Sequence, residues 1–181
     1  MTTLVDKVLA VARSLDEAEI PYAFGGAIAL AYCTEDPRGT RDIDVNAFVP
    51  ASDAARLLAA LPSAVLVPEG TAQVVAADGQ VRLWWDDTPV DLFLDYAPLH
   101  AQAARGRRTV PFAGRQISVL GPVELVLFKA LFDRPKDWVD IATVLEAGAL
   151  LEPQAVHRGL VELLGPDDAR VARWTALVDE A

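Results

Sequence analysis

The chain has 181 residues and a formal net charge of −10, and 52% of its residues are hydrophobic. No apolar run approaches the ~18 residues that a membrane-spanning helix needs, and the first residues lack a signal-peptide layout, so we expect a cytoplasmic protein without a membrane partner. The acidic charge opposes nonspecific binding to nucleic acid, the single cysteine excludes an internal disulfide, and two histidines leave no cluster for zinc.

The first part of the chain alternates predicted helices and strands. Apolar side chains recur at helical spacing over residues 4–19, which predicts an amphipathic helix. The elements expected next are, in chain order, a strand at 22–24, a helix at 27–32, a strand at 43–49, a helix from Ser52 or Asp53 to Leu61, and strands at 64–67, 73–76, 81–85 and 90–94. Asp78-Gly79 predicts a hairpin turn between the strands at 73–76 and 81–85.

The pattern becomes entirely helical after Gly121. Before it we expect a helix at 98–105 and paired strands at 109–112 and 116–119, with Pro111 confining the first of these to a sheet edge. The helices expected after it cover 122–133, 136–147, 153–165 and a last segment capped by Asp167. The sequence therefore predicts an α/β (α+β) fold, in which a small mixed β-sheet flanked by helices spans 1–120 and a C-terminal helical bundle spans 121–181.

Two carboxylates lie at the start of the predicted strand at 43–49. Residues two apart on a strand point to the same side, so Asp42 and Asp44 share one side while Ile43 and Val45 point into the core. Such a pair is tolerated when it is solvated or when a cation lies between the two groups. Mg²⁺ prefers oxygen ligands and commonly shares a site between carboxylates and substrate phosphates. The pair therefore indicates either a metal site or a solvated strand edge.

A third acid, Asp91, lies early in the otherwise apolar strand at 90–94. A charge in such a strand must be paired, solvated or bound to a metal. Asp86 and Asp87 compete for the same role, but they lie at a predicted turn. Asp91 is therefore the better candidate for a group that joins the pair before it.

A Gly-Gly turn precedes the acids. Gly25 and Gly26 end a strand and open a helix, where backbone N–H groups can approach a phosphate closely, although a plain turn would use the same residues. A glycine turn, a short helix, an Asp-x-Asp strand and a third acid on a later strand together resemble the nucleotidyltransferase superfamily, which has the DNA-polymerase-β-like fold. In this order Gly25-Gly26, Asp42, Asp44 and Asp91 match that signature.

Finer features resemble the AbiEii-type nucleotidyltransferase toxins. Arg38, Thr40 and Asp42-Ile43-Asp44 match an Arg-x-Thr-x-Asp-Ile-Asp form. A helical lysine followed by an Arg-x-Lys-Asp-x-x-Asp segment extends the match, and its members here are Lys129, Arg134, Lys136, Asp137 and Asp140. One departure is Ala27, because many members carry Ser or Thr at or after the second glycine. Phosphate binding would then depend on backbone amides.

The resemblance implies a metal-dependent enzyme that transfers NMP from ATP or another nucleoside triphosphate to an acceptor hydroxyl and releases pyrophosphate. It implies that Asp42, Asp44 and Asp91 hold two Mg²⁺ ions with the bound nucleotide. Lys129 would neutralise charge on the transferring group, although it can instead pair with Asp137 or Asp140. The residues implied in nucleotide binding are Gly25, Gly26, Arg38, Thr40, Lys136, Asp137 and Asp140; a structural ion-pair network around Arg134 is the alternative for the last three.

The acceptor stays open. A toxin of a toxin–antitoxin system would act on tRNA and have an antitoxin partner, with local RNA contacts from Arg105, Arg107, Arg108 and Arg115. A small-molecule acceptor such as an aminoglycoside fits the acidic charge, because acidic clefts attract cations. A protein acceptor is a third option. A noncatalytic nucleotide-binding module of the same fold, or an unrelated α/β protein with a solvated Asp pair, are the remaining alternatives.

Overall fold

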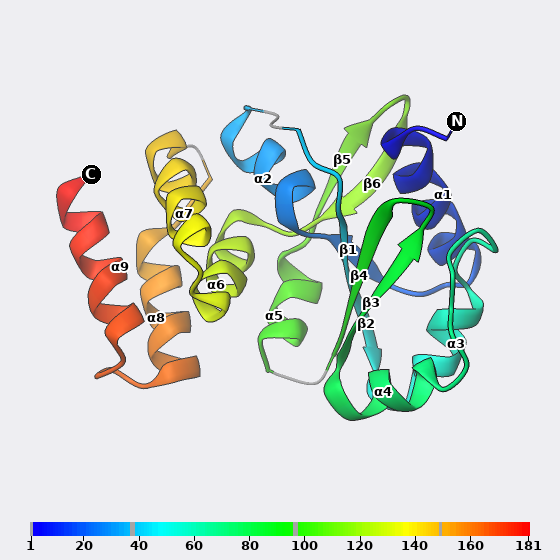
Figure 1. Ribbon diagram of the computed structural model, residues 1–181. Helices are drawn as coiled ribbons and strands as arrows, with labels where there is room; N and C mark the ends of the chain where they lie inside the picture. The colour runs from blue at the N-terminus through cyan, green and yellow to red at the C-terminus, as the bar shows by residue number, and fades with distance from the viewer. Residues whose placement is uncertain (1, 37–38, 96–97, 149) are drawn as a thin grey trace.

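A six-stranded mixed sheet forms the centre of the computed structural model, which describes residues 2–36, 39–95, 98–148 and 150–181 (Figure 1). The strand order is β3-β4-β2-β1-β6-β5. The strands are β1 (Tyr22–Phe24), β2 (Ile43–Pro50), β3 (Gln80–Trp85), β4 (Thr88–Asp95), β5 (Arg108–Phe112) and β6 (Arg115–Val119). Helices flank this sheet, so the predicted fold class is confirmed.

The helices lie on both sides of the sheet. They are α1 (Leu4–Glu17), α2 (Gly26–Thr34), α3 (Ala54–Ala59) after a 3₁₀ turn (Ala51–Asp53), α4 (Thr71–Asp78), α5 (Pro98–Gly106), α6 (Pro122–Phe132), α7 (Pro135–Ala147), α8 (Pro153–Leu164) and α9 (Ala169–Glu180). Figure 1 shows α1 and α3 on one side and α2, α5 and α6 on the other, with α9 farthest from the sheet.

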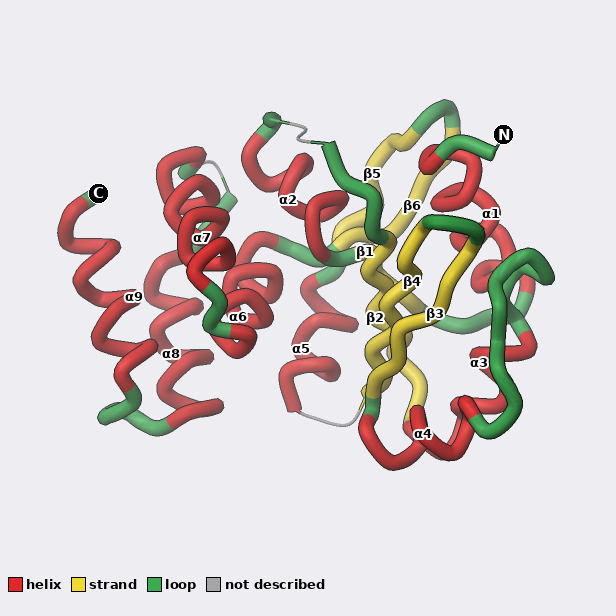
Figure 2. Tube along the Cα trace, in the orientation of Figure 1, coloured by secondary structure: helices red, strands yellow, loops and turns green. Residues whose placement is uncertain are grey.

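Every described element after β6 is a helix, as Figure 2 shows. Helices α6 and α7 both pack against α2, so this helical segment contacts the part of the chain that carries the sheet. The division into units at 1–120 and 121–181 stays a prediction.

Strands β2 and β4 place the candidate acids. Ile43, Val45 and Leu92 are completely buried, whereas Asp44 and Asp91 are only partly covered. The two strands run parallel, and Asp44 is the register partner of Asp91. Since side chains alternate between faces with a period of two, the apolar residues of both strands point into one core and the acids point to the opposite face.

Residues 64–79 differ from the sequence-based expectation. The predicted strand at 73–76 lies inside helix α4, and 64–67 contributes only an isolated bridge between Leu66 and Trp84. Asp78-Gly79 ends α4 instead of forming a hairpin turn, with Gly79 in the left-handed region at φ 69°. Adjacent β-branched residues favour a strand locally, but this segment gains more by burying Val75 completely as a helix against the core.

Two further local predictions have different outcomes. Pro111 lies on β5 at the sheet edge, as expected from its missing N–H. The cap of α9 is Asp168, whose carboxylate accepts a hydrogen bond from the Arg170 N–H, and not Asp167. Within the described ranges, no helix combines the length and apolar character needed to cross a membrane.

Candidate active site

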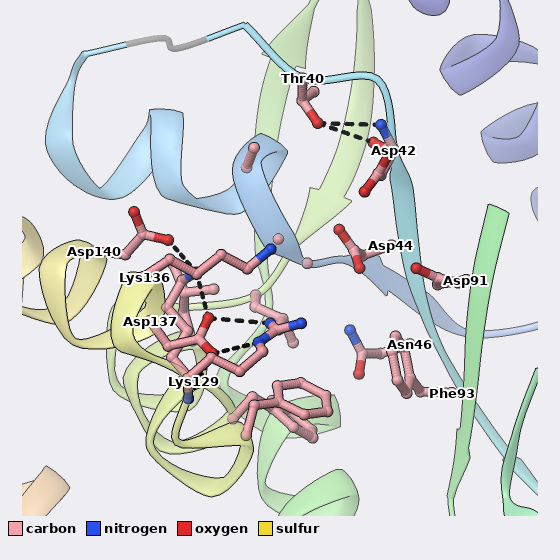
Figure 3. Close-up of a pocket in the computed structure, with 18 of the residues that line it drawn as sticks. Thr40, Asp42, Asp44, Asn46, Asp91, Phe93, Lys129, Lys136, Asp137 and Asp140 are labelled. Atoms are coloured by element: carbon pink, nitrogen blue, oxygen red, sulfur yellow. Dashed lines mark hydrogen bonds and ion pairs between the residues drawn. The ribbon is translucent and has the colours of Figure 1, made fainter. Parts of the chain in front are cut away.

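Three carboxylates line one cavity between the sheet and helices α2, α6 and α7. Asp44 on β2 lies beside Asp91 on β4, and Asp42 immediately precedes β2. The cavity, called the first cavity here, has a volume of about 150 Å³, and all three acids line it (Figure 3). The structure therefore brings together the acids that the sequence singled out from separate strands.

The electrostatic state of Asp44 reflects crowding by negative charge. Burial, followed by the nearby carboxylates of Asp91 and Asp42, raises the pKa of Asp44 to about 6. The more distant positive charges of Lys129 and Arg134 oppose this shift without cancelling it. The ionised carboxylate of Asp44 therefore lacks sufficient compensation from the protein, and a divalent cation would supply it.

This donor set fits a hard cation such as Mg²⁺, because carboxylate oxygens in a polar cavity are the ligands that Mg²⁺ prefers. Within the described residues, however, no three acidic, cysteine or histidine side chains are arranged as a group that could already hold a metal ion. The acids share the cavity but would have to adjust their side chains to share one ion.

The Gly25-Gly26 turn lies directly against Asp44. The N–H of Gly25 donates to the carbonyl oxygen of Asp44 at 2.9 Å. Gly26 opens α2 with φ 51°, and a Cβ at this position would overlap the carboxylate of Asp44. Only glycine fits both the left-handed backbone and this close approach. The start of α2, with its free amide groups and favourable dipole, thus borders the same cavity as the acids.

Thr40 fixes the backbone in front of β2. Its hydroxyl accepts a hydrogen bond from the Asp42 N–H at 3.2 Å and lies 3.4 Å from the Asp42 carbonyl oxygen (Figure 3). Thr40 also lines the first cavity. Its expected contact with a nucleotide stays a prediction. Arg38, which the sequence also assigned to nucleotide binding, lies outside the described residues.

An ion-pair network joins α6 to α7 on the opposite wall. The ammonium of Lys129, a residue only 6% exposed, donates to Asp140 Oδ2 at 2.6 Å and lies 3.7 Å from Asp137 Oδ1. Arg134 donates to both carboxylate oxygens of Asp137, at 2.6 and 3.1 Å. Burial alone would raise the pKa of Asp137, but the hydrogen bonds and charge of Arg134, with Lys129, hold this pKa below its ordinary value.

The pairing alternative for Lys129 is therefore present, and its action on a transferring group stays a prediction. Lys136 behaves differently, because it is exposed and its side chain extends across the first cavity toward Asp44 (Figure 3). Lys129, Lys136, Asp137 and Asp140 all line the first cavity, so the two distant segments of the motif meet there.

Sequence reasoning missed Arg82. This residue on β3 is the register partner of Asp91, and its guanidinium donates to both oxygens of that carboxylate, at 2.8 and 2.7 Å. The hydrogen bonds from Arg82 to Asp91 in turn raise the pKa of Arg82. Both strands were predicted, so the register of a β3–β4 hairpin turning at Asp86 and Asp87 was the signal that would have found this pair.

Sequence reasoning also missed the aromatic wall of the site. Phe93 on β4 and Phe132 at the end of α6 have ring centroids 5.9 Å apart, and the Arg134 guanidinium lies 4.9 Å from the Phe132 centroid. Phe128 lines the first cavity beside them. These rings offer a surface on which a planar group such as a nucleobase can stack.

A second cavity, of about 440 Å³, adjoins the first. The two share Asp44, Arg82, Asp91, Phe93, Phe132 and Arg134. The second cavity adds residues from α4 and β3, which are Val74, Asp78, Gln80 and Val81, and it does not include the Gly25-Gly26 turn or Lys136. Asp44 and Asp91 thus lie at the boundary between two differently lined spaces.

The sequence matches no protein-family model and no curated protein. The structure is similar to the antibiotic-resistance factor ANT(2'')-Ia in solution, with a TM-score of 0.62, 19% identity and coverage of 99% of this chain and 97% of that one. It is also similar to an antigenic nucleotidyltransferase-like protein from Paracoccidioides brasiliensis, with a TM-score of 0.54, 20% identity and coverage of 96% and 91%.

A third similar structure is the lincomycin-bound lincosamide antibiotic adenylyltransferase LnuA, with a TM-score of 0.56, 12% identity and coverage of 81% of this chain and 99% of that one. At these identities the likeness establishes the fold, which is that of nucleotidyltransferases and agrees with the superfamily resemblance of the sequence. The finer resemblance to AbiEii-type toxins stays a prediction.

Proposed function

We propose that this protein is a Mg²⁺-dependent nucleotidyltransferase that transfers NMP from a nucleoside triphosphate to an acceptor hydroxyl and releases pyrophosphate. The observation that carries the proposal is the position of Asp44 and Asp91: the two lie side by side on parallel strands, and Asp44 lies directly against the Gly25-Gly26 turn. Asp42 completes an acidic wall that faces the start of a helix across one cavity.

In this proposal Asp42, Asp44 and Asp91 hold the metal ions, which neutralise phosphate charge and favour ionisation of the acceptor hydroxyl when bound. The raised pKa of Asp44 supports this assignment, because burial and then the neighbouring carboxylates of Asp91 and Asp42 disfavour its charged form, and a bound cation would compensate that charge. The carboxylate wall also orients the acceptor hydroxyl, and a carboxylate oxygen accepts the proton that this hydroxyl releases.

The phosphates bind on the other side of the acids. The N–H groups of Gly26 and of the next residues at the start of α2 donate to the phosphate oxygens, while the N–H of Gly25 is bound to the Asp44 carbonyl, and no hydroxyl is needed at Ala27. The exposed ammonium of Lys136 reaches the same space and neutralises charge on the departing pyrophosphate (Figure 3). The ion pairs of Lys129 and Arg134 with buried carboxylates keep α7 in the position that Lys136 requires.

The second cavity is the proposed entry for the acceptor. A nucleophile in phosphoryl transfer approaches roughly in line with the leaving group. With pyrophosphate at the glycine turn, the opposite approach to Asp44 and Asp91 is through the second cavity, which the turn does not line. Its volume of about 440 Å³ is within the range of small-molecule sites, roughly 300–1,000 Å³.

The charge of this entry favours a cationic small molecule. Arg82 and Arg134 at its boundary are each paired with a carboxylate, whereas Asp78 adds an exposed negative charge at its rim. The net charge of −10 adds long-range attraction for cations. An amine-bearing compound such as an aminoglycoside fits these features, and two of the similar structures are named as antibiotic-resistance or antibiotic-modifying proteins.

A tRNA acceptor is the second candidate, in which the protein would be a toxin with an antitoxin partner. The observation in its favour is that Thr40, Asp42, Lys136 and Asp140 from the AbiEii-like motif line one cavity. The arginines expected to contact RNA support this candidate less, because Arg107 already donates a hydrogen bond to the Ala104 carbonyl oxygen and Arg108 donates one to the Tyr32 carbonyl oxygen.

The test is pyrophosphate release and mass change of the acceptor. Each of ATP, CTP, GTP and UTP would be combined with Mg²⁺ and either a set of aminoglycosides or tRNA. Asp44→Asn should reduce the rate by about a thousandfold or more, because it removes a charge held for the metal and the transition state. Asp87→Asn, at a turn where the side chain is 98% exposed, is the matched control and should retain the rate.

Each outcome selects one function. Turnover with an amine-bearing small molecule supports the first candidate, and turnover with tRNA alone supports the second. Calorimetric binding of a nucleotide with Mg²⁺ but without turnover on any acceptor would identify a noncatalytic module. Absence of metal-dependent nucleotide binding would contradict the proposal.

A further inference from the structure

The pair of Arg82 and Asp91 stands apart from the other charges of the site. Both carboxylate oxygens of Asp91 accept hydrogen bonds from Arg82, at 2.8 and 2.7 Å, in the bidentate geometry that makes arginine–carboxylate pairs strong. The two residues face each other across paired strands, so the backbone register itself brings them together. The carboxylate that would complete the metal site is thus already bound to a cation of the protein.

The two partners differ in how freely they can separate. The Asp91 side chain is 14% exposed and fixed on a central strand, whereas the Arg82 side chain is 54% exposed on the edge strand β3. An exposed guanidinium regains water when it leaves, and this hydration offsets part of the loss of its two hydrogen bonds to Asp91. Arg82 is therefore the partner that can move.

The surroundings of Asp91 explain why a cation is needed there. The register partner of Asp91 on β2 is Asp44, and Asp42 lines the same cavity. Like charges on neighbouring strands destabilise a sheet unless something compensates them. Without a metal ion, Arg82 supplies that compensation from the opposite side of Asp91.

We propose that Arg82 is a positioning residue that occupies Asp91 in the metal-free protein and is displaced from it when the divalent metal loads. The absence of a ready metal group among the described residues agrees with this arrangement, because one of the three carboxylates is committed to Arg82. The inference depends on the proposed function, since it assigns Asp91 to the metal site.

Displacement has a structural consequence. Arg82 lines both cavities, so a guanidinium released from Asp91 stays at the boundary between the nucleotide and the acceptor. Metal loading then frees a positive charge on the wall of the second cavity, through which the acceptor enters.

The test uses Mn²⁺ as the probe, with free Mn²⁺ measured by electron paramagnetic resonance in titrations of the metal-free full chain. Arg82→Gln should bind Mn²⁺ about fivefold more tightly, the equivalent of losing a competing ion pair of about 1 kcal/mol. Arg82→Lys should lie between Arg82→Gln and the unmodified protein, because lysine keeps the charge but not the bidentate geometry.

Lys136→Gln is the matched control, since it removes one positive charge from the same cavity without touching Asp91. It should tighten Mn²⁺ binding by less than about twofold, the effect of the general field. If Arg82→Gln binds Mn²⁺ no more tightly than Lys136→Gln does, Arg82 does not compete with the metal. Metal-free Arg82→Gln should also melt at a lower temperature and gain more from Mn²⁺ than the unmodified chain.

Failure of this inference is distinguishable from failure of the proposed function. If Asp44→Asn abolishes metal-dependent turnover while Arg82→Gln leaves Mn²⁺ affinity unchanged, the function stands and the role of Arg82 is wrong. If no form of the protein binds Mn²⁺, with or without ATP, both proposals are wrong. Should Arg82→Gln not fold without metal, Arg82→Lys decides: unchanged Mn²⁺ affinity in that variant overturns the inference.

Discussion

Ionised side chains line two walls of the first cavity. The sheet wall carries Asp42, Asp44 and Asp91, and the helix wall, formed by α6 and α7, carries Lys129 and Asp137 with Arg134 between the helices. The two walls compensate their charges differently. On the sheet wall, burial and then the neighbouring carboxylates of Asp91 and Asp42 raise the pKa of Asp44, and nearby positive charges do not cancel this shift. On the helix wall, Asp137 keeps a lowered pKa because Arg134 and Lys129 bind it directly. The helix wall therefore uses its charges to hold two helices together, whereas the sheet wall leaves charge that a metal ion compensates in the proposed function.

The largest effect is expected from breaking the helix wall. Lys129→Met leaves Asp137 and Asp140 without their shared buried cation and should lower the free energy of unfolding by about 3–5 kcal/mol. Urea denaturation followed by circular dichroism would measure it. If the loss is below about 1 kcal/mol, the pairs are solvent-screened and the helix wall is not a structural unit.

The sheet wall should respond in the opposite direction. The folded-state pKa of Asp44, about 6, lies above its ordinary value of 3.8. This group therefore contributes stability below pH 3.8 and loses that contribution as the pH rises through 6. Asp44→Asn removes this loss and should stabilise the metal-free protein at pH 7 by up to about 3 kcal/mol.

The measurement for Asp44 is a thermal melt of both forms between pH 4 and pH 8 without metal. The gap between Asp44→Asn and the unmodified chain should widen across this range and narrow again when Mg²⁺ and a nucleotide are added. A gap that does not change with pH would contradict uncompensated charge on the sheet wall.

The contact between the acids and the glycine turn offers a sharper test. Gly26→Ala combines a left-handed backbone with an overlap of its Cβ and the Asp44 carboxylate, whereas Gly114→Ala, at φ 81°, meets nothing within 4 Å. Gly114→Ala should cost about 1 kcal/mol from the backbone alone. Gly26→Ala should cost about 2 kcal/mol more, the scale of overpacking, and also weaken nucleotide binding.

Urea unfolding and calorimetric titration of ATP with Mg²⁺ would compare the two alanine variants. Equal losses of stability in both would mean that the carboxylate of Asp44 relaxes away from the turn without cost. Unchanged nucleotide binding by Gly26→Ala would contradict a phosphate site at the turn.

The smallest expected effect distinguishes the two lysines. Lys136 is exposed and reaches into the cavity, so Lys136→Gln should leave the melting temperature within about 1 °C while raising the KM for the nucleoside triphosphate roughly tenfold, about 1.4 kcal/mol. Steady-state kinetics and a thermal melt suffice. An unchanged KM would remove Lys136 from the phosphate site and leave the helix wall purely structural.

Local sequence patterns predicted some elements of the fold and not others. Strands β2 and β4 were predictable because Ile43, Val45 and Leu92 alternate with acids at the period of a half-buried strand. Helix α4 was not, since adjacent valines favour a strand and only the burial of Val75 against the core favours the helix. Local propensity is weak compared with burial, so tertiary packing decides such a segment.

Candidate residues followed the same division. The acids and the glycine turn were found from spacing and residue type, since a carboxylate in an apolar strand needs a partner wherever the strand lies. The sequence offered Asp137 and Asp140 as alternative partners for Lys129, and helix packing places both of them beside it. The partner of Arg82 was missed, because this residue lies opposite Asp91 through strand register and not through sequence spacing.

The sequence by itself determined which side chains carry charge, which segments bury their apolar faces and that Gly26 is followed by two acids at the spacing of a strand. Only the tertiary structure decided where each charge is compensated. The physical reason is that an ion pair depends on distances of a few ångströms between atoms far apart in the chain, as for Arg82 and Asp91 at 2.7 Å or Lys129 and Asp140 at 2.6 Å.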